Sequence, residues 1–521
     1  MSKPLAAESA VAPASPPVPR GLVLLLLMLA AVGWGVAIVP VLRSDDLSID
    51  EHVSYWIAAG DNPGTLGQRS LEYAATPPLS SVVQRFSLDL FGRHAWALRL
   101  PSLVAMAAAP LLLFFAGRKL FGPLAGGMAA VLIAWHPDLL DAARVARPYG
   151  LSIALACGAI LATLWWRESP DSWLRLGVWV AVQAALAWTH YVNIPFVALL
   201  TVLALGPWPD GGFVRALVAR RCVAIGVLAL LGSPLIWSFL RVWELRPVLS
   251  FLQTAPSLAH QIGTFALVLL PIGVALRLLQ EPPEGAAAGV GAGRGTFAVL
   301  LCLGLGLQGV FYGLSQGVAP TLGHQRYAVA GAAATVLLGA GLLSSVAARF
   351  ALPAALCGLA GAWFLSGQVP WKSPIIDARE AHDWAALSRR IAAEGQPDEP
   401  IFTAGGLVEA GLVPALGSDP MFLDYVASRT GRFEIPHPHP RLGLPMLPRQ
   451  LGQALSFYEP VIQQAASNGK AVWLAAATDI DLGRETSQAL HGYLLQSGWR
   501  VDLELQEVTA RLERFQPPGS R

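Results

Sequence analysis

Apolar residues in this chain gather in long runs that are separated by shorter polar connections. About eleven runs are apolar enough to cross a bilayer as helices, which takes about 17–25 residues, and the third and sixth are short. The predicted spans are residues 21–42, 96–117, 123–137, 149–166, 175–191, 193–208, 222–240, 261–279, 296–314, 327–346 and 350–367. Only helices satisfy every backbone amide within such segments, so the pattern predicts a polytopic α-helical membrane protein.

Basic residues in the short connections predict the orientation of the spans. Those on the side of the N-terminal tail are Arg118, Lys119, Arg167, Arg175, Arg215, Arg220 and Arg221. Lys and Arg are enriched in cytoplasmic loops, so we expect a disordered cytoplasmic tail over residues 1–20. An odd number of spans then places the C-terminus on the opposite side, in a periplasm-like compartment.

The residues after the last span have a different pattern. Residues 368–521 combine a helical stretch, Asp377–Glu394, with strand-like runs at Pro400–Thr403, Ala471–Ala476 and Val501–Leu505. Mixed elements of this kind predict a small soluble α/β domain. We therefore expect a membrane domain over residues 21–367 and a periplasmic domain over residues 368–521.

The composition agrees with a membrane location. Of the 521 residues, 54% are hydrophobic and 13% are charged, whereas about 25% are charged in an average soluble domain. The mean hydropathy is +0.51. The net charge of +2 gives no reason to expect a nucleic-acid partner.

The first outer loop, over residues 43–95, is unusually long and polar. It begins with an acidic cluster of Asp45, Asp46, Asp50 and Glu51. Further along, Pro78–Phe91 has apolar residues at helical spacing, which predicts a helix that lies flat on the membrane surface. Such a loop suits an enzyme that works at the membrane face better than it suits a transporter.

Other polar residues are predicted at the same membrane level. They are Asp138, Asp141, Arg144, Arg147 and Tyr149 in the second outer loop, His190 and Tyr191 after the fifth span, and His324, Gln325, Arg326 and Tyr327 at the tenth. Carboxylates and arginines that converge at one interface suggest a site for an anionic substrate. The alternative is that the arginines only reach the lipid head groups and that the loop carboxylates are only solvated.

Seven short motifs follow one another over residues 40–330. They are Asp50-Glu51, Thr76-Pro-Pro-Leu79, Leu90-Phe-Gly with Ala97-Leu-Arg-Leu-Pro-Ser102, Gly117-Arg-Lys-Leu-Phe-Gly122, Arg147-Pro-Tyr149, Thr189-His-Tyr191 and Arg326-Tyr327. Together they resemble the motifs of GT-C-fold glycosyltransferases that use a polyprenyl-phosphate sugar. The resemblance is to the bacterial group related to the aminoarabinose lipid A transferases and the protein O-mannosyltransferases.

The resemblance implies an inverting transfer of a sugar from a polyprenyl phosphate to an acceptor hydroxyl, on the periplasmic side of a bacterial inner membrane. A carboxylate that takes the acceptor proton is then needed; Asp50 is the first candidate and Glu51 the second. Candidates for binding the donor phosphate are Arg147, Tyr149, Arg326 and Tyr327. Candidates for binding the rest of the substrates are Asp138, Asp141, His190 and Tyr191.

Two positions depart from the family pattern. Thr76 replaces the family's histidine, and Val145 replaces a glutamate two residues before Arg147. The acid of the second loop is then supplied by Asp138 or Asp141, or is missing, and a role for a divalent cation is left open. The acceptor, whether lipid, glycan or protein, is also open. So are the alternatives of a transporter or flippase for a lipid-linked or anionic substrate, and of an inactive GT-C-like scaffold subunit.

Overall fold

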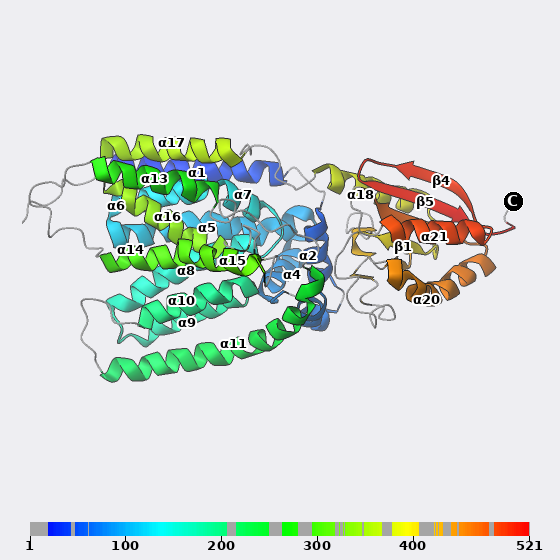
Figure 1. Ribbon diagram of the computed structural model, residues 1–521, viewed down its shortest axis with the longest axis horizontal. Coiled ribbons are helices and arrows are strands. Elements are labelled where there is room, and N and C mark those ends of the chain that lie inside the picture. The colour runs from blue at the N-terminus through cyan, green and yellow to red at the C-terminus, as the bar shows by residue number, and fades with distance from the viewer. Residues whose placement is uncertain are drawn as a thin grey trace, which may run out of the picture.

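The computed structural model contains a bundle of helices and, at one end of it, a small domain with a β-sheet (Figure 1). The described residues are 19–42, 47–60, 62–74, 76–205, 215–249, 263–279, 294–317, 322, 327, 329–345, 348–366, 378–405, 421, 424–425, 427–430, 439–444, 448–478 and 484–519. The predicted disordered tail therefore lies almost entirely outside the described residues, as do the first two members of the acidic cluster.

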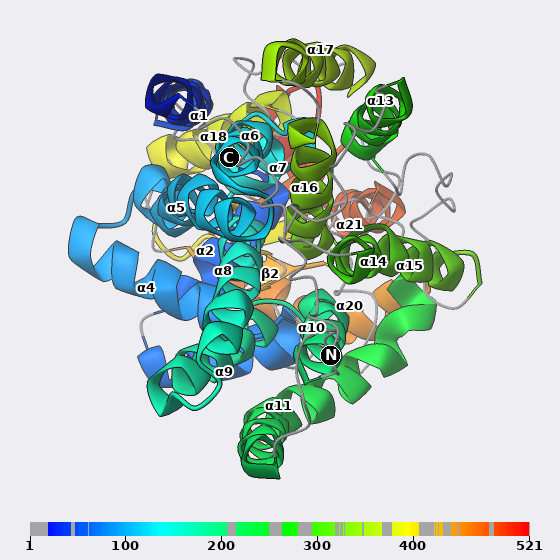
Figure 2. The same ribbon diagram turned by 90° about the vertical axis from the view of Figure 1, so that its left-hand side faces the viewer.

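The bundle consists mainly of apolar helices that overlap the predicted spans, together with one polar helix in the second outer loop. They are α1 (Arg20–Leu42), α5 (Ala95–Phe121), α6 (Pro123–Ala134), α7 (Pro137–Arg144), α8 (Tyr149–Glu168), α9 (Trp173–Ala187), η3 (Tyr191–Asn193), α10 (Ile194–Leu205), α11 (Arg215–Leu249), α13 (Thr264–Leu279), α14 (Arg294–Leu301), η6 (Cys302–Gly306), α15 (Leu307–Ser315), α16 (Val329–Ser344) and α17 (Ala348–Ser366). Helix α5 packs against α6 and α8, and α16 packs against α6, whereas α11 lies at the outside against α9 (Figure 2).

Several of these helices have the length and the surface of membrane spans. Among the described residues, four helices are long and apolar enough to cross a membrane, and seven shorter apolar helices occupy the other predicted positions. Large apolar side chains are exposed on their outer faces, for example Leu230 on α11 at 72% and Phe364 on α17 at 85%. Exposed apolar surface of this extent is stable where lipid covers it.

The first outer loop is folded into short helices between α1 and α5. They are α2 (Ile49–Ala58), η1 (Pro63–Thr65), α3 (Leu66–Gln68), η2 (Arg69–Tyr73) and α4 (Leu79–Phe91). The predicted amphipathic helix is confirmed as α4, which exposes Val82, Phe86 and Leu90 along one face. Its buried face includes Ser80, Ser81, Gln84 and Ser87. This arrangement, with apolar residues outward and polar residues inward, is the one expected of a helix that rests on lipid.

The C-terminal residues form the expected α/β domain around a five-stranded sheet. Its elements are α18 (Ala378–Glu394), β1 (Ile401–Ala404), η11 (Ala427–Thr430), β2 (Arg441–Gly443), α20 (Pro448–Ser467), β3 (Val472–Ala477), α21 (Arg484–Gln496), β4 (Arg500–Gln506) and β5 (Ala510–Gln516). The strand order is β2-β1-β3-β5-β4, with β1 parallel to β2 and β3, and β5 antiparallel to β3 and β4.

Alternate residues of the central strands enter two different cores. Phe402 and Leu474 pack on the side of α20 and α21 with Phe515, whereas Ile401 and Trp473 pack on the side of α18. Both faces of the sheet are therefore covered by helices, which explains why β1 and β3 are buried along their whole length.

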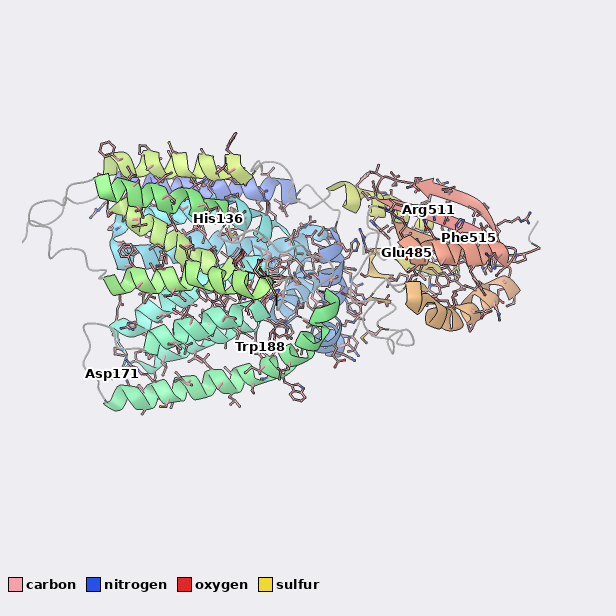
Figure 3. All side chains as sticks on the ribbon, in the orientation of Figure 1. His136, Asp171, Trp188, Glu485, Arg511 and Phe515 are labelled. Carbon is pink, nitrogen blue, oxygen red and sulfur yellow. The ribbon has the colours of Figure 1, made fainter. Side chains whose placement is uncertain are left out.

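The two parts of the chain lie end to end. Trp188, after α9, lies near the end of the bundle that faces the α/β domain, whereas Asp171, before α9, lies at the far end (Figure 3). Near the far end, Lys119 is paired with Glu168 and Arg220 with Asp171. The polar outer loops and the basic connections thus occupy opposite ends, as the sequence pattern predicts.

Candidate functional site

Helix α2 carries the first two candidate residues in its first turn. Ser48 is the N-cap residue, and Glu51 completes a capping box with it. Successive residues of a helix point about 100° apart, so the two carboxylates leave α2 in different directions. The Glu51 side chain points into the protein and is fully buried, whereas the Asp50 side chain is 36% exposed.

Glu51 is bonded to three different parts of the structure. Its carboxylate forms a bidentate ion pair with the buried Arg99 of α5, with Oε1–Nε at 2.7 Å and Oε2–Nη2 at 2.8 Å. Ala146 donates its backbone N–H to Oε1 at 2.8 Å, and Ser48 donates its N–H to Oε2 at 3.1 Å. Burial opposes the charged form, but the Arg99 charge and these hydrogen bonds hold the pKa of Glu51 below its ordinary value. Glu51 therefore anchors α2 to the bundle.

The segment between α7 and α8 is held in place by hydrogen bonds to its backbone carbonyls. The Ala146 carbonyl accepts a hydrogen bond from the Gln84 side chain at 2.9 Å, and the Arg147 carbonyl accepts one from Ser102 Oγ at 3.0 Å. A Cβ atom at Gly150 would lie only 2.9 Å from the Ser102 carbonyl oxygen. The close approach of α8 to α5 therefore requires a glycine, and it holds the start of α8 in place.

This packing brings Arg147 next to Asp50. The Arg147 Nε atom lies 3.9 Å from Asp50 Oδ2, and Arg147 Nη1 donates to the Asp50 carbonyl oxygen at 3.4 Å. The Arg147 side chain is 13% exposed. A partly exposed carboxylate can accept a proton from a substrate, and a guanidinium is well shaped to bind a phosphate. The pair thus combines two groups that sugar transfer from a phosphate needs.

Three other candidates form an aromatic row. The rings of Tyr149 and His190 are stacked with centroids 5.8 Å apart, and the ring of Tyr327 lies 5.6 Å from that of His190. His190 Nδ1 accepts the backbone N–H of Val192 at 3.3 Å, so a neutral His190 carries its proton on Nε2. Tyr149 is two residues from Arg147, which connects the row to the Asp50–Arg147 pair.

Two further candidates are Tyr191, which contacts α11, and Arg326. The Tyr191 hydroxyl is 2.5 Å from Ser238 Oγ on α11, and its ring contacts Phe239 at 5.7 Å. Tyr191 thus packs η3 against α11. Arg326 falls outside the described residues.

Asp138 and Asp141 lie on α7, each near a basic side chain. Asp138 Oδ2 lies 3.9 Å from His136 Nδ1, and Asp141 Oδ1 lies 3.6 Å from Arg144 Nη1. Burial lowers the pKa of His136 to about 3 and raises that of Asp141 to about 7. Within the described part of the chain, no three His, Cys, Asp or Glu side chains gather closely enough to hold a metal ion.

Comparison with known proteins identifies the fold. Residues 75–240 match the family described as dolichyl-phosphate-mannose-protein mannosyltransferase, and no curated protein matches the chain in sequence. The crystal structure of ArnT from Cupriavidus metallidurans in the apo state is similar over 95% of this chain and 98% of that chain, with 13% identity and a TM-score of 0.56. This chain has the GT-C fold.

Two further GT-C structures agree with this assignment. The crystal structure of ArnT from Cupriavidus metallidurans bound to undecaprenyl phosphate covers the same shares of both chains, with 14% identity and a TM-score of 0.55. The cryo-EM structure of the arabinofuranosyltransferase AftD from Mycobacteria matches 97% of this chain and 40% of its own, with 15% identity and a TM-score of 0.51. The resemblance to GT-C glycosyltransferases expected from the motifs is thereby confirmed.

The two positions that depart from the GT-C motifs both lie in hydrogen-bonded turns. Thr76 closes a turn, because its N–H donates to the Ser70 carbonyl at 2.9 Å and its own carbonyl accepts from Ser70 Oγ at 2.7 Å. The Val145 side chain packs against the core of the bundle, and its carbonyl accepts the N–H of Arg147 at 2.7 Å. Of the side chains themselves, the Thr76 hydroxyl lies 3.4 Å from Ser70 Oγ and Val145 contributes apolar contact to the core.

Sequence reasoning missed the importance of Arg99 and Trp56. Arg99 was noted only as part of a motif, although an arginine inside an apolar run is a signal for a buried partner. Trp56 is buried between the membrane domain and the α/β domain. Its partner lies far away in the sequence, so no local pattern could have revealed it.

Proposed function

We propose that this protein is a membrane glycosyltransferase that moves a sugar from a polyprenyl-phosphate carrier to an acceptor hydroxyl. Transfer would take place on the periplasmic side of a bacterial inner membrane and would invert the anomeric carbon. The observation that carries the proposal is the Asp50–Arg147 pair, with Oδ2 and Nε 3.9 Å apart, at the domain-facing end of a GT-C bundle. The similar ArnT structure, which was solved with undecaprenyl phosphate, supports a lipid-phosphate donor.

Asp50 is proposed as the general base. The acceptor oxygen attacks the anomeric carbon while its proton passes to the Asp50 carboxylate, on the face opposite the leaving phosphate. Partial exposure leaves Asp50 accessible to an acceptor. Glu51, in contrast, is proposed as a positioning residue, because its carboxylate is buried and bonded to Arg99, Ala146 and Ser48.

Arg147 and the aromatic row are proposed to bind the donor. As the bond between the anomeric carbon and the phosphate oxygen breaks, its electron pair stays on the polyprenyl phosphate. Arg147 stabilises that charge, assisted by Tyr149 and by the Nε2–H of His190. From the sequence, Arg326 and Tyr327 are proposed for the same phosphate, and Asp138, Asp141 and Tyr191 for binding the rest of the substrates.

The proposal is tested by incubating the purified protein with radiolabelled undecaprenyl-phosphate mannose, glucose, arabinose and aminoarabinose in the presence of membrane extracts. Cleavage of one donor and transfer of its label to a lipid, glycan or protein is the expected result. Movement of the intact lipid across proteoliposomes without cleavage would instead favour the flippase. Binding of the donor without either outcome would favour the inactive scaffold.

A further inference from the structure

One face of α2 lies against the C-terminal domain. Ile49, Val53 and Trp56 follow one another at helical spacing, and we call these three residues the docking stripe. They belong to one apolar cluster with Met421 and Tyr425 of the C-terminal domain. The rings of Trp56 and Tyr425 are 5.0 Å apart. The stripe is therefore the place where the first outer loop meets the C-terminal domain.

Asp424 connects the docking stripe to the sheet. Its Oδ2 accepts the indole N–H of Trp56 at 2.8 Å, and its Oδ1 accepts from Arg441 Nη2 at 2.6 Å. Arg441 is the first residue of β2. The Arg69 guanidinium lies over the Trp56 ring, 4.6 Å from its centroid, and donates to the Trp56 carbonyl at 2.8 Å. A single carboxylate thus links α2 to the sheet across the boundary between the domains.

The docking stripe lies beside the proposed catalytic carboxylate. Asp50 follows Ile49 directly, so its side chain leaves α2 about 100° around the helix from the stripe. Glu51 leaves on the opposite side of α2, about 200° from Ile49, and enters the bundle. The Asp50 side chain therefore leaves α2 between the direction of the C-terminal domain and the direction of the bundle, and 36% of it is exposed.

We propose that Asp424 is a positioning residue that keeps the C-terminal domain docked on α2, and that the docked domain limits the access of water to the donor sugar beside Asp50, whose side chain is 36% exposed with the domain in place. This inference rests on the proposed function. The reaction that docking slows is hydrolysis of the donor. In it, a water oxygen bonds to the anomeric carbon, one water proton goes to Asp50, and the bond to phosphate breaks with its electron pair on the polyprenyl phosphate. Closure of a site against water selects for the intended acceptor in this way.

The test uses Asp424→Asn in the full-length protein. Asparagine keeps one acceptor oxygen and gains an NH₂ group, so either Trp56 or Arg441 loses its acceptor and the charge is lost. Asp502→Asn is the matched control, because Asp502 lies on β4, at the far edge of the same sheet, and accepts from Gln516 at 2.7 Å. The donor is the undecaprenyl-phosphate sugar that the wild-type protein uses, supplied without an acceptor.

We expect release of free sugar to rise about tenfold in Asp424→Asn, and not in Asp502→Asn. The gain must disappear when Asp50→Asn is added, since the hydrolysis uses the same carboxylate. A structural defect alone would lower all turnover instead of raising hydrolysis. Unchanged or lower hydrolysis in Asp424→Asn, with transfer intact in the wild type, would overturn the inference and leave the proposed function standing.

A second measurement does not depend on activity. Hydrogen exchange of the α2 amides, read by mass spectrometry, reports how often the docking stripe is released. We expect faster exchange over residues 52–58 in Asp424→Asn and in Trp56→Phe, which keeps a ring but lacks the N–H donor. The double variant should add little to either single one, because both remove the same hydrogen bond. Exchange equal to that of the wild type in both single variants would overturn the docking role.

Discussion

Replacement of Glu51 by glutamine separates an anchoring role from a catalytic one. The side chain keeps its size, but one carboxylate oxygen becomes an NH₂ group. Both oxygens of Glu51 accept hydrogen bonds from N–H donors, Oε1 from Arg99 and Ala146 and Oε2 from Arg99 and Ser48. In either orientation the amide therefore places a donor against donors, and the buried Arg99 loses its counter-charge.

The expected cost follows from the burial of the pair. Glu51 and Arg99 are both 0% exposed, and removing one partner of a buried ion pair typically costs about 3–5 kcal/mol. Glu51 joins α2 to α5 and to the segment between α7 and α8. Loss of the ion pair therefore weakens the connection between the first outer loop and the bundle. We expect the free energy of unfolding of Glu51→Gln to fall by about this amount.

The assay is unfolding in mixed micelles, followed by circular dichroism. Glu72→Gln is the matched control, because Glu72 is in the same loop, is exposed and accepts only from Gln68 at 3.2 Å among its described contacts; a change within about 0.5 kcal/mol is expected for it. Glu51→Gln with wild-type stability but no turnover would refute the anchoring role and would restore Glu51 as a candidate base.

The same pair predicts a dependence on pH. The folded pKa of Glu51 lies below its ordinary value, so the unfolded chain binds the proton first as the pH falls. The stability that Glu51 contributes is therefore complete above the ordinary pKa of about 4.3, and it is lost as the pH falls through the folded pKa. The stability difference between the wild type and Glu51→Gln should shrink in that window.

Other parts of the site give three further predictions. Arg147→Lys keeps the charge but loses the planar pair of donors, so KM for the lipid donor should rise on the order of tenfold with a smaller effect on kcat; unchanged donor saturation would contradict the phosphate role. Burial raises the pKa of Asp141 to about 7. As the pH rises from about 4 to 7, the unfolded chain loses the Asp141 proton before the folded protein does, so the wild type should lose stability over this range and Asp141→Asn should not. Equal pH slopes of the unfolding midpoint would argue against this. Gly150→Ala brings a Cβ to 2.9 Å from the Ser102 carbonyl oxygen and should destabilise the protein by about 1–3 kcal/mol. Gly177→Ala is the control, because a Cβ there has nothing within 4 Å. Equal melting temperatures of the two variants would contradict the close approach of α8 to α5.

Most helices of the bundle could be predicted from the sequence, because apolar runs of span length have few alternative structures in lipid. The span 149–166 corresponds to α8 at Tyr149–Glu168, for example. The third span was predicted to reach residue 137, whereas α6 ends at Ala134, where the chain turns into α7. The helix α11 extends well beyond 222–240 at both ends, because its flanking turns are polar but still helical.

The α/β domain was predicted less completely. The strands β1, β3 and β4 and the helix α18 were expected near their observed places, but β2, α20 and α21 were not, and neither was β5. Its sequence carries Arg511, Glu513 and Arg514, which do not suggest a central strand. In the fold, the buried Glu513 lies 3.0 Å from His491 Nδ1 and 3.2 Å from Arg511 Nη2. Tertiary partners of this kind cannot be read from a local pattern.

The sequence indicated which residues belong to the candidate site better than it indicated which residues each of them contacts. The sequence indicated Asp50, Arg147 and Tyr149, and the fold brings the first two together. It did not indicate that Glu51 would be buried against Arg99, because the two are separated by 48 residues. It also indicated Tyr191 for substrate binding, which stays a prediction; the described contacts of Tyr191 are with Ser238 and Phe239 of α11.

The central claim is that Asp50 takes the acceptor proton during sugar transfer from a polyprenyl phosphate. The most direct measurement compares the wild type with Asp50→Asn in single-turnover transfer of label from the donor that the wild type uses. Asp89→Asn, an exposed acid of the same loop that pairs with Arg85, is the control. The proposal predicts a loss of about 10²–10⁴-fold in Asp50→Asn with normal membrane insertion and donor binding, and near-wild-type transfer in Asp89→Asn. Near-normal transfer by Asp50→Asn would contradict it.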